Sequence, residues 1–249
     1  MPRGHPVVLA NGSEWPNKRS AENHFRSMRD RWPRNVVIDA ADDHDDLCAL
    51  LERYDETITT GPSKTGCGVD HFVTRENSVH GGISIGFWVI RTDRSETDFS
   101  FIDAVAGLPR NTDAQFVEAC RESVFPELMA AKEAFFRTHG DVSGQVPCAV
   151  TGHLISFDAA RVDHAPKTLR DLAWEFRLRE GWGSAIPDGI ISRPLDAQLE
   201  TTFVDMNAMV RFTAFHRTHA TLRMVSKSVL RSRLLATRAA LVRLPVAIS

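Results

Sequence analysis

The side chains best suited to acid–base or metal chemistry lie in two short segments of the sequence. In ARVDHAP (160–166) a short β-prone run ends in Asp163 and His164, and a proline follows shortly after. Further along the chain, HRTH places His216 and His219 three positions apart, which on a helix puts both rings on one face. An imidazole with its ordinary pKa of about 6.5 can take a proton from water near neutral pH. A carboxylate oxygen suits a hard cation such as Mg²⁺ or Mn²⁺.

Both pairs also have a structural interpretation, and the sequence leaves it open. Asp163 and His164 could form a hydrogen-bonded turn at the end of a strand. His216 and His219 could pack their rings against a hairpin. Because side chains alternate along a strand, we expect Asp163 and His164 to point to opposite sides, with Asp163 toward a helix.

The bulk composition is that of a globular protein. Its 249 residues suit one large domain or two small ones, and a hydrophobic content of 43% is enough for a core. The formal net charge of -2 gives no global sign of nucleic-acid binding. The charges are distributed unevenly, since residues 39–56 are strongly acidic while every charged side chain from Asn207 onward is basic. The basic tail could contact phosphate, or it could be a solvated face.

Cysteine usage and hydropathy predict the compartment. The four cysteines form no CxxC pair, which argues against a four-thiolate zinc site. The polar start does not resemble a signal peptide, and no apolar run is long enough to span a bilayer. We therefore expect free thiols in a reducing cytoplasm and no membrane partner. The segment GPSKTG lacks the spacing of a phosphate-binding loop, which excludes a P-loop NTPase.

The first half is expected to mix helices with a hairpin. Helical spacing predicts helices over 20–32, with Ser20 as the N-cap, and over 45–54. VDHFVTRE and ISIGFWVIRTD are β-prone runs separated by NSVHGG, which predicts a hairpin. The following TDFSFIDAV either continues the sheet or begins a helix. A long helix over 112–138, kinked or split at Pro126, then leads into the second half.

The second half is expected to begin with another hairpin. VPCAVTGHLISFDAARVDHAP predicts two strands that turn near SFDAA. LRDLAWEFRLREG predicts a helix, and the remaining chain is predicted mostly helical with a break near 221–226. Together the elements predict an α+β fold with a small antiparallel sheet. Its expected parts are a first domain over residues 1–110, a connector helix over 111–140 and a second domain over 141–249.

Four motifs of the first half occur in the order and spacing of a known domain: NGSEWPNKRSAENHFRSM, LCALLERYDE, KTGCGVDHFVTR and FWVIRTDRSETDFSF. They resemble the DCL-type (DUF3223-type) domain, a family named from a plant defect in chloroplasts and leaves and also found in bacteria. The resemblance implies a nucleic-acid-related role and supplies no catalytic mechanism. In this half Lys64, Arg75 and Arg91 could face phosphate, with a solvated sheet face as the alternative.

Two segments of the second half, CAVTGHLISFDAARVDH and FHRTHATLRMVSKSVLRSR, resemble the opening hairpin and closing strand-to-helix segment of HNH endonucleases, the ββα-metal type. The resemblance implies metal-dependent hydrolysis of phosphodiester bonds. His164 would deprotonate the attacking water. Asp163 and one or both of His216 and His219 would hold Mg²⁺ or Mn²⁺, with Zn²⁺ less favoured. The residues expected on the nucleic-acid backbone are Arg223, Lys227, Arg231 and Arg233.

The closing segment departs from the HNH pattern at two positions. Thr221 and Leu230 stand where the family often has Asn or His. Leucine cannot bind metal, so either His216 and His219 supply the ligand from a shifted position, or the site has lost its metal.

We therefore expect an HNH-type endonuclease that acts on nucleic acid, DNA rather than RNA, in restriction of foreign DNA. The alternative is a non-catalytic nucleic-acid-binding protein or RNA-processing factor with a degenerate HNH fold. The apolar C-terminal segment LLATRAALVRLPVAI could in addition form a homodimer contact.

Overall fold

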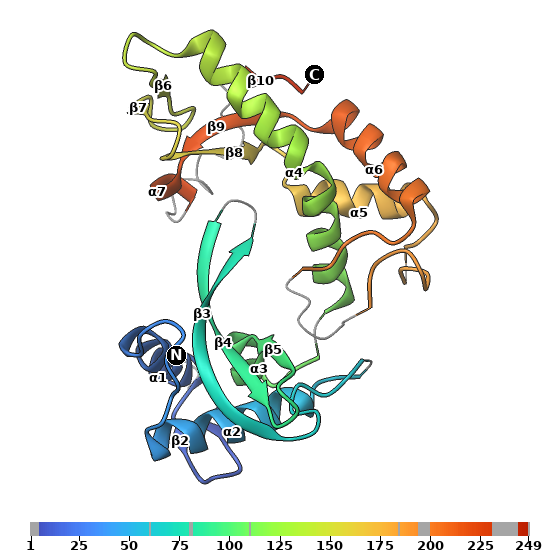
Figure 1. The fold of residues 1–249 in the computed structure, drawn as a ribbon. Coiled ribbons are helices and arrows are strands. Elements are labelled where there is room, and N and C mark those ends of the chain that lie inside the picture. Colours follow the sequence, from blue (N-terminus) through green and yellow to red (C-terminus); the bar gives the residue numbers. More distant parts are fainter. Residues whose placement is uncertain are drawn as a thin grey trace. The chain divides into compact units, whose positions relative to one another are not determined.

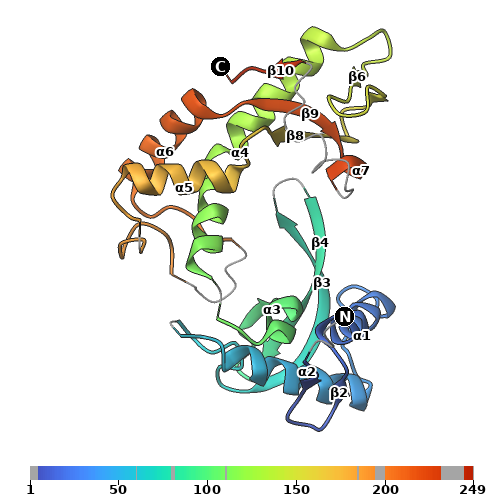
Figure 2. The same cartoon turned by 180° about the vertical axis from the view of Figure 1, so that it is seen from behind.

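The computed structural model describes residues 5–59, 61–79, 82–109, 111–183, 185–193, 200–230 and 244–248. The chain divides into two compact units (Figures 1 and 2). Unit 1 comprises Met1–Ala114 with Arg193–Thr201, and unit 2 comprises Gln115–Ser192 with Thr202–Ser249. Both mix helices with small antiparallel sheets, which confirms the predicted α+β class. In the described part of the chain, no helix combines the length and apolar character needed to cross a membrane.

A three-stranded antiparallel sheet is the frame of unit 1. Strands β3 (Val69–Val79) and β4 (Gly82–Arg91) form the predicted hairpin, and β5 (Glu96–Phe99) pairs with β4. The segment TDFSFIDAV was predicted either to continue the sheet or to begin a helix, and it does both. It completes β5 and then begins the short helix α3 (Phe101–Ala106), whose first turn is capped by the Ser100 side chain.

Three helices cover one face of this sheet. Helix α1 (Lys18–Arg31) is capped by Asn17 rather than by the predicted Ser20, because the Asn17 side chain accepts from the Ser20 amide. Helix α2 (Ala41–Asp55) begins four residues before the predicted start. Apolar residues at helical spacing in α1 and α2 are buried, and they pack with phenylalanines of the sheet: Phe25, Met28, Leu47, Leu50, Leu51, Phe72, Phe87 and Phe99. A two-stranded pair, β1 (Val7–Val8) and β2 (Glu14–Trp15), precedes α1.

The long helix α4 (Thr112–His139) contributes to both hydrophobic clusters of unit 2. Pro126 does not split it, and the helix continues to His139. Its first half packs through Phe116 and Val124 on the helices α5 (Leu169–Arg179) and α6 (Met206–His219). Its second half packs through Ala131 and Phe135 on the sheet of unit 2. The helix expected as a connector therefore supplies both cores of this unit.

The strand pairing of unit 2 differs from the predicted hairpin. Strand β6 (Val146–Pro147) pairs with β7 (Leu154–Ile155), but β8 (Ala160–His164) pairs with β9 (Leu222–Ser226), and β10 (Pro245–Val246) joins β9. The β6–β7 pair is only two residues long on each strand, while β9 pairs with all five residues of β8 and contributes the buried apolar side chains of Leu222, Met224 and Val225. The predicted break near 221–226 is therefore a strand.

The short helix α7 (Lys227–Leu230) follows β9 directly, which completes a strand–strand–helix arrangement of β8, β9 and α7. The continuation at 231–243, which includes Arg231, Arg233 and much of the proposed dimer segment, lies outside the described residues.

Candidate functional site

Two of the predicted histidines meet in unit 2. His164 is the last residue of β8, paired in register with Leu222 of β9, and His216 lies in the last turn of α6. A hydrogen bond from the Ala165 amide to the Thr221 carbonyl oxygen, 3.0 Å long, ties the ends of these elements together. As a result His164 Nε2 lies 2.8 Å from His216 Nε2, with the ring planes inclined by 69°.

This contact leaves one polar atom without a partner. One ring must donate its Nε2 hydrogen to the other, so at least one of the two is neutral. The His216 side chain is 0% exposed, and its Nδ1 makes no hydrogen bond to any described residue. If His216 accepts, its Nδ1 is a buried unpaired donor, and if it donates, its Nδ1 is a buried unpaired acceptor. Either arrangement costs about 1–3 kcal/mol relative to a satisfied group.

The surroundings keep both imidazole rings neutral. Burial is the largest cause that lowers the pKa of His164 to about 4, and the neighbouring His216 and Arg121 of α4 lower it further. Burial likewise lowers the pKa of His216 to about 4, against an opposing effect of Glu127. At neutral pH the pair is thus a neutral base that can accept one further proton. Because one hydrogen already lies between the two Nε2 atoms, the added proton would bind at a ring Nδ1.

Asp163 does not join the pair. As the alternation of the strand predicts, it points to the other side, where its Oδ2 accepts from Arg223 at 2.7 and 2.8 Å. The two residues are direct cross-strand partners, and Arg223 is 1% exposed. Burial raises the pKa of Asp163, and the hydrogen bond and charge of Arg223 oppose that rise. Asp163 and Arg223 therefore neutralise each other inside the unit. Their roles as metal ligand and phosphate contact stay predictions, which this arrangement does not support.

His219 also takes a position apart from the pair. Its ring stacks on Phe215, with centroids 4.1 Å apart, and its Nδ1 hydrogen-bonds the Phe215 carbonyl oxygen at 2.8 Å. These local contacts hold the His219 ring against its own helix, so the structure does not bring it to the His164–His216 pair. Its role as a metal ligand stays a prediction.

The described side chains do not assemble the donor set expected for Mg²⁺ or Mn²⁺. Among them, no group of three or more His, Cys, Asp and Glu is placed to hold one ion. His164 and His216 alone would offer two nitrogens, whereas hard cations prefer oxygen. Two nitrogens on one tetrahedral ion lie about 3.3 Å apart, so even for Zn²⁺ the pair would have to open. The sequence from Leu230 to Ser249 contains no Asp, Glu, His, Asn or Cys that could complete the set.

The basic residues predicted to contact nucleic acid fall into two groups. Lys64 and Arg91 are buried. The Lys64 ammonium donates to Thr97 Oγ1 at 2.9 Å, and the Arg91 guanidinium donates to the Lys64 carbonyl oxygen at 3.0 Å. In these positions the two cations hold the loop 61–68 against the sheet, and their role at phosphate stays a prediction that the contacts do not support. Arg75 lies on the outer face of the sheet, paired with Glu96 and placed over the Trp88 ring. Lys227 is exposed at the start of α7.

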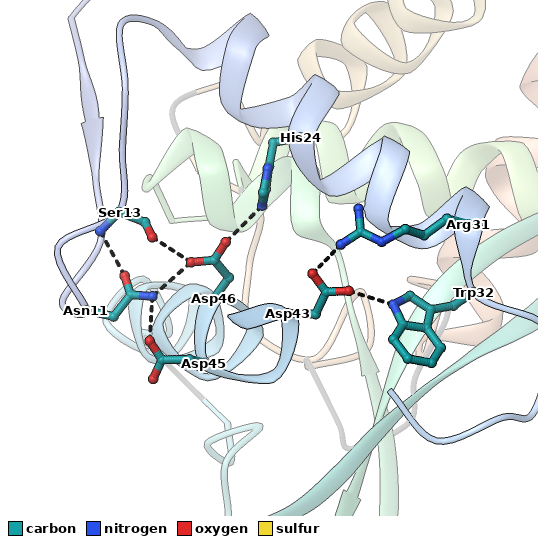
Figure 3. A network of polar contacts seen from close by, with 8 residues as sticks. All are labelled: Asn11, Ser13, His24, Arg31, Trp32, Asp43, Asp45 and Asp46. Carbon is teal, nitrogen blue, oxygen red and sulfur yellow. Dashed lines mark hydrogen bonds and ion pairs between the residues drawn. The ribbon is translucent and has the colours of Figure 1, made fainter. Parts of the chain in front are cut away.

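A second buried polar cluster lies in unit 1, where the N-terminal pair of strands meets α1 and α2 (Figure 3). Asp46 is its centre. One carboxylate oxygen accepts from Ser13 Oγ at 2.6 Å and from Asn11 Nδ2 at 2.8 Å, and the other meets His24 Nε2 at 2.9 Å. The residue types are those of a hydrolytic triad, but the aspartate stands between the other two. His24 is therefore not placed to deprotonate Ser13.

Asp43, one turn earlier in α2, is held in a similar way. Its carboxylate accepts from Trp32 Nε1 at 2.7 Å and pairs with Arg31 (Figure 3). These contacts tie the end of α1 to the start of α2. Asn11, Ser13 and His24 belong to the motif NGSEWPNKRSAENHF, one of those that resemble the DCL-type domain. Their contacts with Asp46 show that this motif holds the N-terminal segment and α1 against α2.

Comparison with known proteins addresses the first half of the chain. Residues 26–105 match a family model described as "Protein of unknown function (DUF3223)", which supports the predicted N-terminal domain. The solution NMR structure of an uncharacterized protein from Rhodospirillum rubrum is similar at 28% identity, over 42% of this chain and 91% of that one, with a TM-score of 0.34. No curated protein matches the chain.

Proposed function

We propose that unit 2 hydrolyses phosphodiester bonds in nucleic acid and that the His164–His216 pair is its reactive centre. The observation that carries this proposal is the 2.8 Å contact between the buried imidazole of His216 and the partly buried imidazole of His164, which come from distant parts of the chain. The contact leaves His216 Nδ1 unsatisfied, and costly polar arrangements of this kind cluster at functional sites. The β8–β9–α7 order, with His164 at a strand end, is in keeping with the HNH-like resemblance.

In this proposal His164 acts as the general base. Its Nδ1 accepts a proton from a water molecule as the water oxygen forms a bond to phosphorus, while the bond from phosphorus to the leaving oxygen breaks and that oxygen takes a proton from solvent. The hydrogen between the two Nε2 atoms then shifts toward His216, which spreads the positive charge over both rings. The negative charge of an approaching phosphate raises the pKa of the pair toward neutrality, which makes it a better base when substrate is present. Arg121, near enough to lower the pKa of His164, is exposed and can face the phosphate. No step is assigned to a metal ion.

The test is cleavage of a supercoiled plasmid and of an RNA by the full chain, each with Mg²⁺, with Mn²⁺ and with EDTA. His164→Ala is expected to reduce cleavage by about 10²–10⁴-fold, the range of general-base catalysis. The matched control is His153→Ala, an exposed histidine of the same unit, which should leave the rate unchanged. Unchanged cleavage by His164→Ala would remove His164 from the mechanism. The plasmid and RNA arms test the choice of DNA over RNA.

The second candidate is a nucleic-acid-binding protein without catalysis. It is favoured by the Asp163–Arg223 ion pair, which withdraws the predicted carboxylate ligand from the site. Binding of oligonucleotides without cleavage in any of the ion conditions would establish it. In either case we place the protein in a reducing cytoplasm, in keeping with the free thiols Cys48, Cys67, Cys120 and Cys148, and a role in restriction of foreign DNA would follow only from cleavage.

A further inference from the structure

Two cations from different elements converge on one carbonyl group in unit 2. Lys132 of α4 is 4% exposed, and its Nζ donates to the Ala160 carbonyl oxygen at 3.0 Å. Arg161 Nη1 donates to the same oxygen at 2.8 Å and to the Asp158 carbonyl oxygen at 3.3 Å. The Lys132 ammonium also lies 4.0 Å from the centre of the Phe157 ring.

Lys227 brings a third positive charge to this end of the sheet. It follows Ser226, the register partner of Ala160, and its amide donates to the Ala159 carbonyl oxygen at 2.9 Å. Its side chain is exposed at the start of α7. Three cations from α4, β8 and α7 are therefore gathered around residues 158–161, and we call them the strand-end cations.

The strand-end cations have few acidic neighbours in the part of the chain that the structure describes. None of the three forms a salt bridge with a carboxylate of the described residues. Burial lowers the pKa of Lys132 most, Arg161 and Lys227 lower it further, and Asp158 is the one acid that opposes them. Like charges held together at a partly desolvated site repel each other, and a bound anion would relieve that repulsion.

We propose that Lys132, Arg161 and Lys227 form a binding site for a phosphate group of the nucleic-acid backbone. Arg161 and Lys227 contact the phosphate oxygens, and Lys132 acts from behind through its charge. The site lies about four residues along β8 from His164, a distance of roughly 13 Å. It is thus separate from the reactive pair and would anchor a neighbouring part of the same strand. The choice of nucleic acid as the source of the phosphate rests on the proposed function.

The test is the affinity of the full chain for short labelled single-stranded DNA and RNA, measured over a range of KCl concentrations in EDTA. Arg161→Gln and Lys227→Gln should each weaken binding roughly threefold or more at low salt. Each should also reduce the slope of log affinity against log salt by about 0.7, the value for one lost phosphate contact on a single strand. Arg170→Gln, an exposed cation of α5, is the matched control and should change neither quantity. Unchanged affinity and slope in both variants would overturn the site.

Lys132→Met separates an electrostatic role from a structural one. The Ala160 carbonyl oxygen keeps its bond from Arg161, and a buried charge is removed, so the melting temperature without ligand should not fall. Oligonucleotide affinity should nevertheless fall. A lower melting temperature with unchanged affinity would make Lys132 purely structural and remove it from the site.

Two further arms of the test identify the source of the phosphate and keep binding at this site distinct from hydrolysis. Inorganic phosphate is tested by its effect on the melting temperature. If it stabilises the wild type but not Arg161→Gln, while oligonucleotide affinity is the same in both, the site takes a free oxyanion and the nucleic-acid assignment is overturned. Because binding is measured without catalysis, a wild type that binds through these residues but cleaves nothing would refute the proposed hydrolysis and leave the strand-end site standing.

Discussion

Each unit contains a cluster of polar side chains around a buried group, Asp46 in unit 1 and His216 in unit 2. The two clusters differ in how completely their hydrogen-bonding atoms are paired. In unit 1 the Asp46 carboxylate has three side-chain partners, two on one oxygen and one on the other. In unit 2 the His164–His216 pair shares a single contact, and the buried Nδ1 of His216 has no partner among the described residues. A satisfied network contributes stability, whereas an unsatisfied one lowers stability and is expected where function maintains it. The comparison thus separates a structural cluster from a candidate reactive centre.

The largest expected effect comes from the ion pair beside the histidines. Asp163→Ala removes the carboxylate partner of the buried Arg223 guanidinium, and should reduce the free energy of unfolding by about 3–5 kcal/mol. Urea unfolding of the full chain, followed by tryptophan fluorescence and compared between variant and wild type, measures it. The double variant Asp163→Leu with Arg223→Met should recover most of the loss. Full stability in Asp163→Ala would show that the carboxylate is free for another role, such as metal binding.

The next effect is a dependence of stability on pH. Folding lowers the pKa of both histidines from 6.5 to about 4, so between these values the unfolded chain binds more protons than the folded one. Stability should therefore be lost as pH falls from about 6.5 toward 4, by about 3 kcal/mol for one proton of the pair. Carboxylates titrate in the lower part of this range, so the measured quantity is the difference between wild type and His216→Phe. Parallel pH profiles of the two proteins would contradict the buried neutral pair.

A smaller effect is expected in unit 1. Asp46→Asn places an amide donor among donors and should reduce stability by about 1–3 kcal/mol. Thermal unfolding by circular dichroism measures the loss. Cleavage per folded molecule should stay at the wild-type level, because this cluster is assigned to stability alone. A variant that keeps its stability but loses cleavage would reverse the contrast between the two clusters.

The smallest change in stability is expected from a surface ion pair, and it gives a reference for the effects of the buried groups. Lys167 and Glu175 form a surface ion pair with a 2.8 Å contact. Lys167→Gln should change stability by less than about 1 kcal/mol, because solvent screens exposed pairs. A change as large as that of Asp163→Ala would mean that exposure does not separate weak from strong charge pairs in this unit.

Local patterns predicted much of the fold. The hairpin of β3 and β4, the long helix α4 and the inward residues Phe25 and Met28 follow from alternation and helical spacing, which depend on near neighbours in the chain. The pairing of β8 with β9 could not be read in this way. It joins residues about sixty positions apart, and the apolar content of residues 222–225 is equally compatible with a helix.

The candidate site was also predicted only in part, because local patterns indicate single residues but not the contacts between distant ones. The type and spacing of His164 and His216 marked them as reactive, and the structure brings them together. The alternation of the strand also indicated that Asp163 would point away from His164. Its partner Arg223 was not identified, because cross-strand register decides that contact and register is a tertiary property. No local pattern marked Lys132, which acquires its environment only when α4 packs on β8.

The most direct measurement of the central claim is a double-variant comparison of single-turnover cleavage. If His164 and His216 act as one proton-accepting unit, His164→Ala, His216→Ala and the double variant should all fall to the same residual rate, because removing either ring disables the pair. Cleavage that persists in His164→Ala, or losses that multiply in the double variant, would contradict a shared reactive centre.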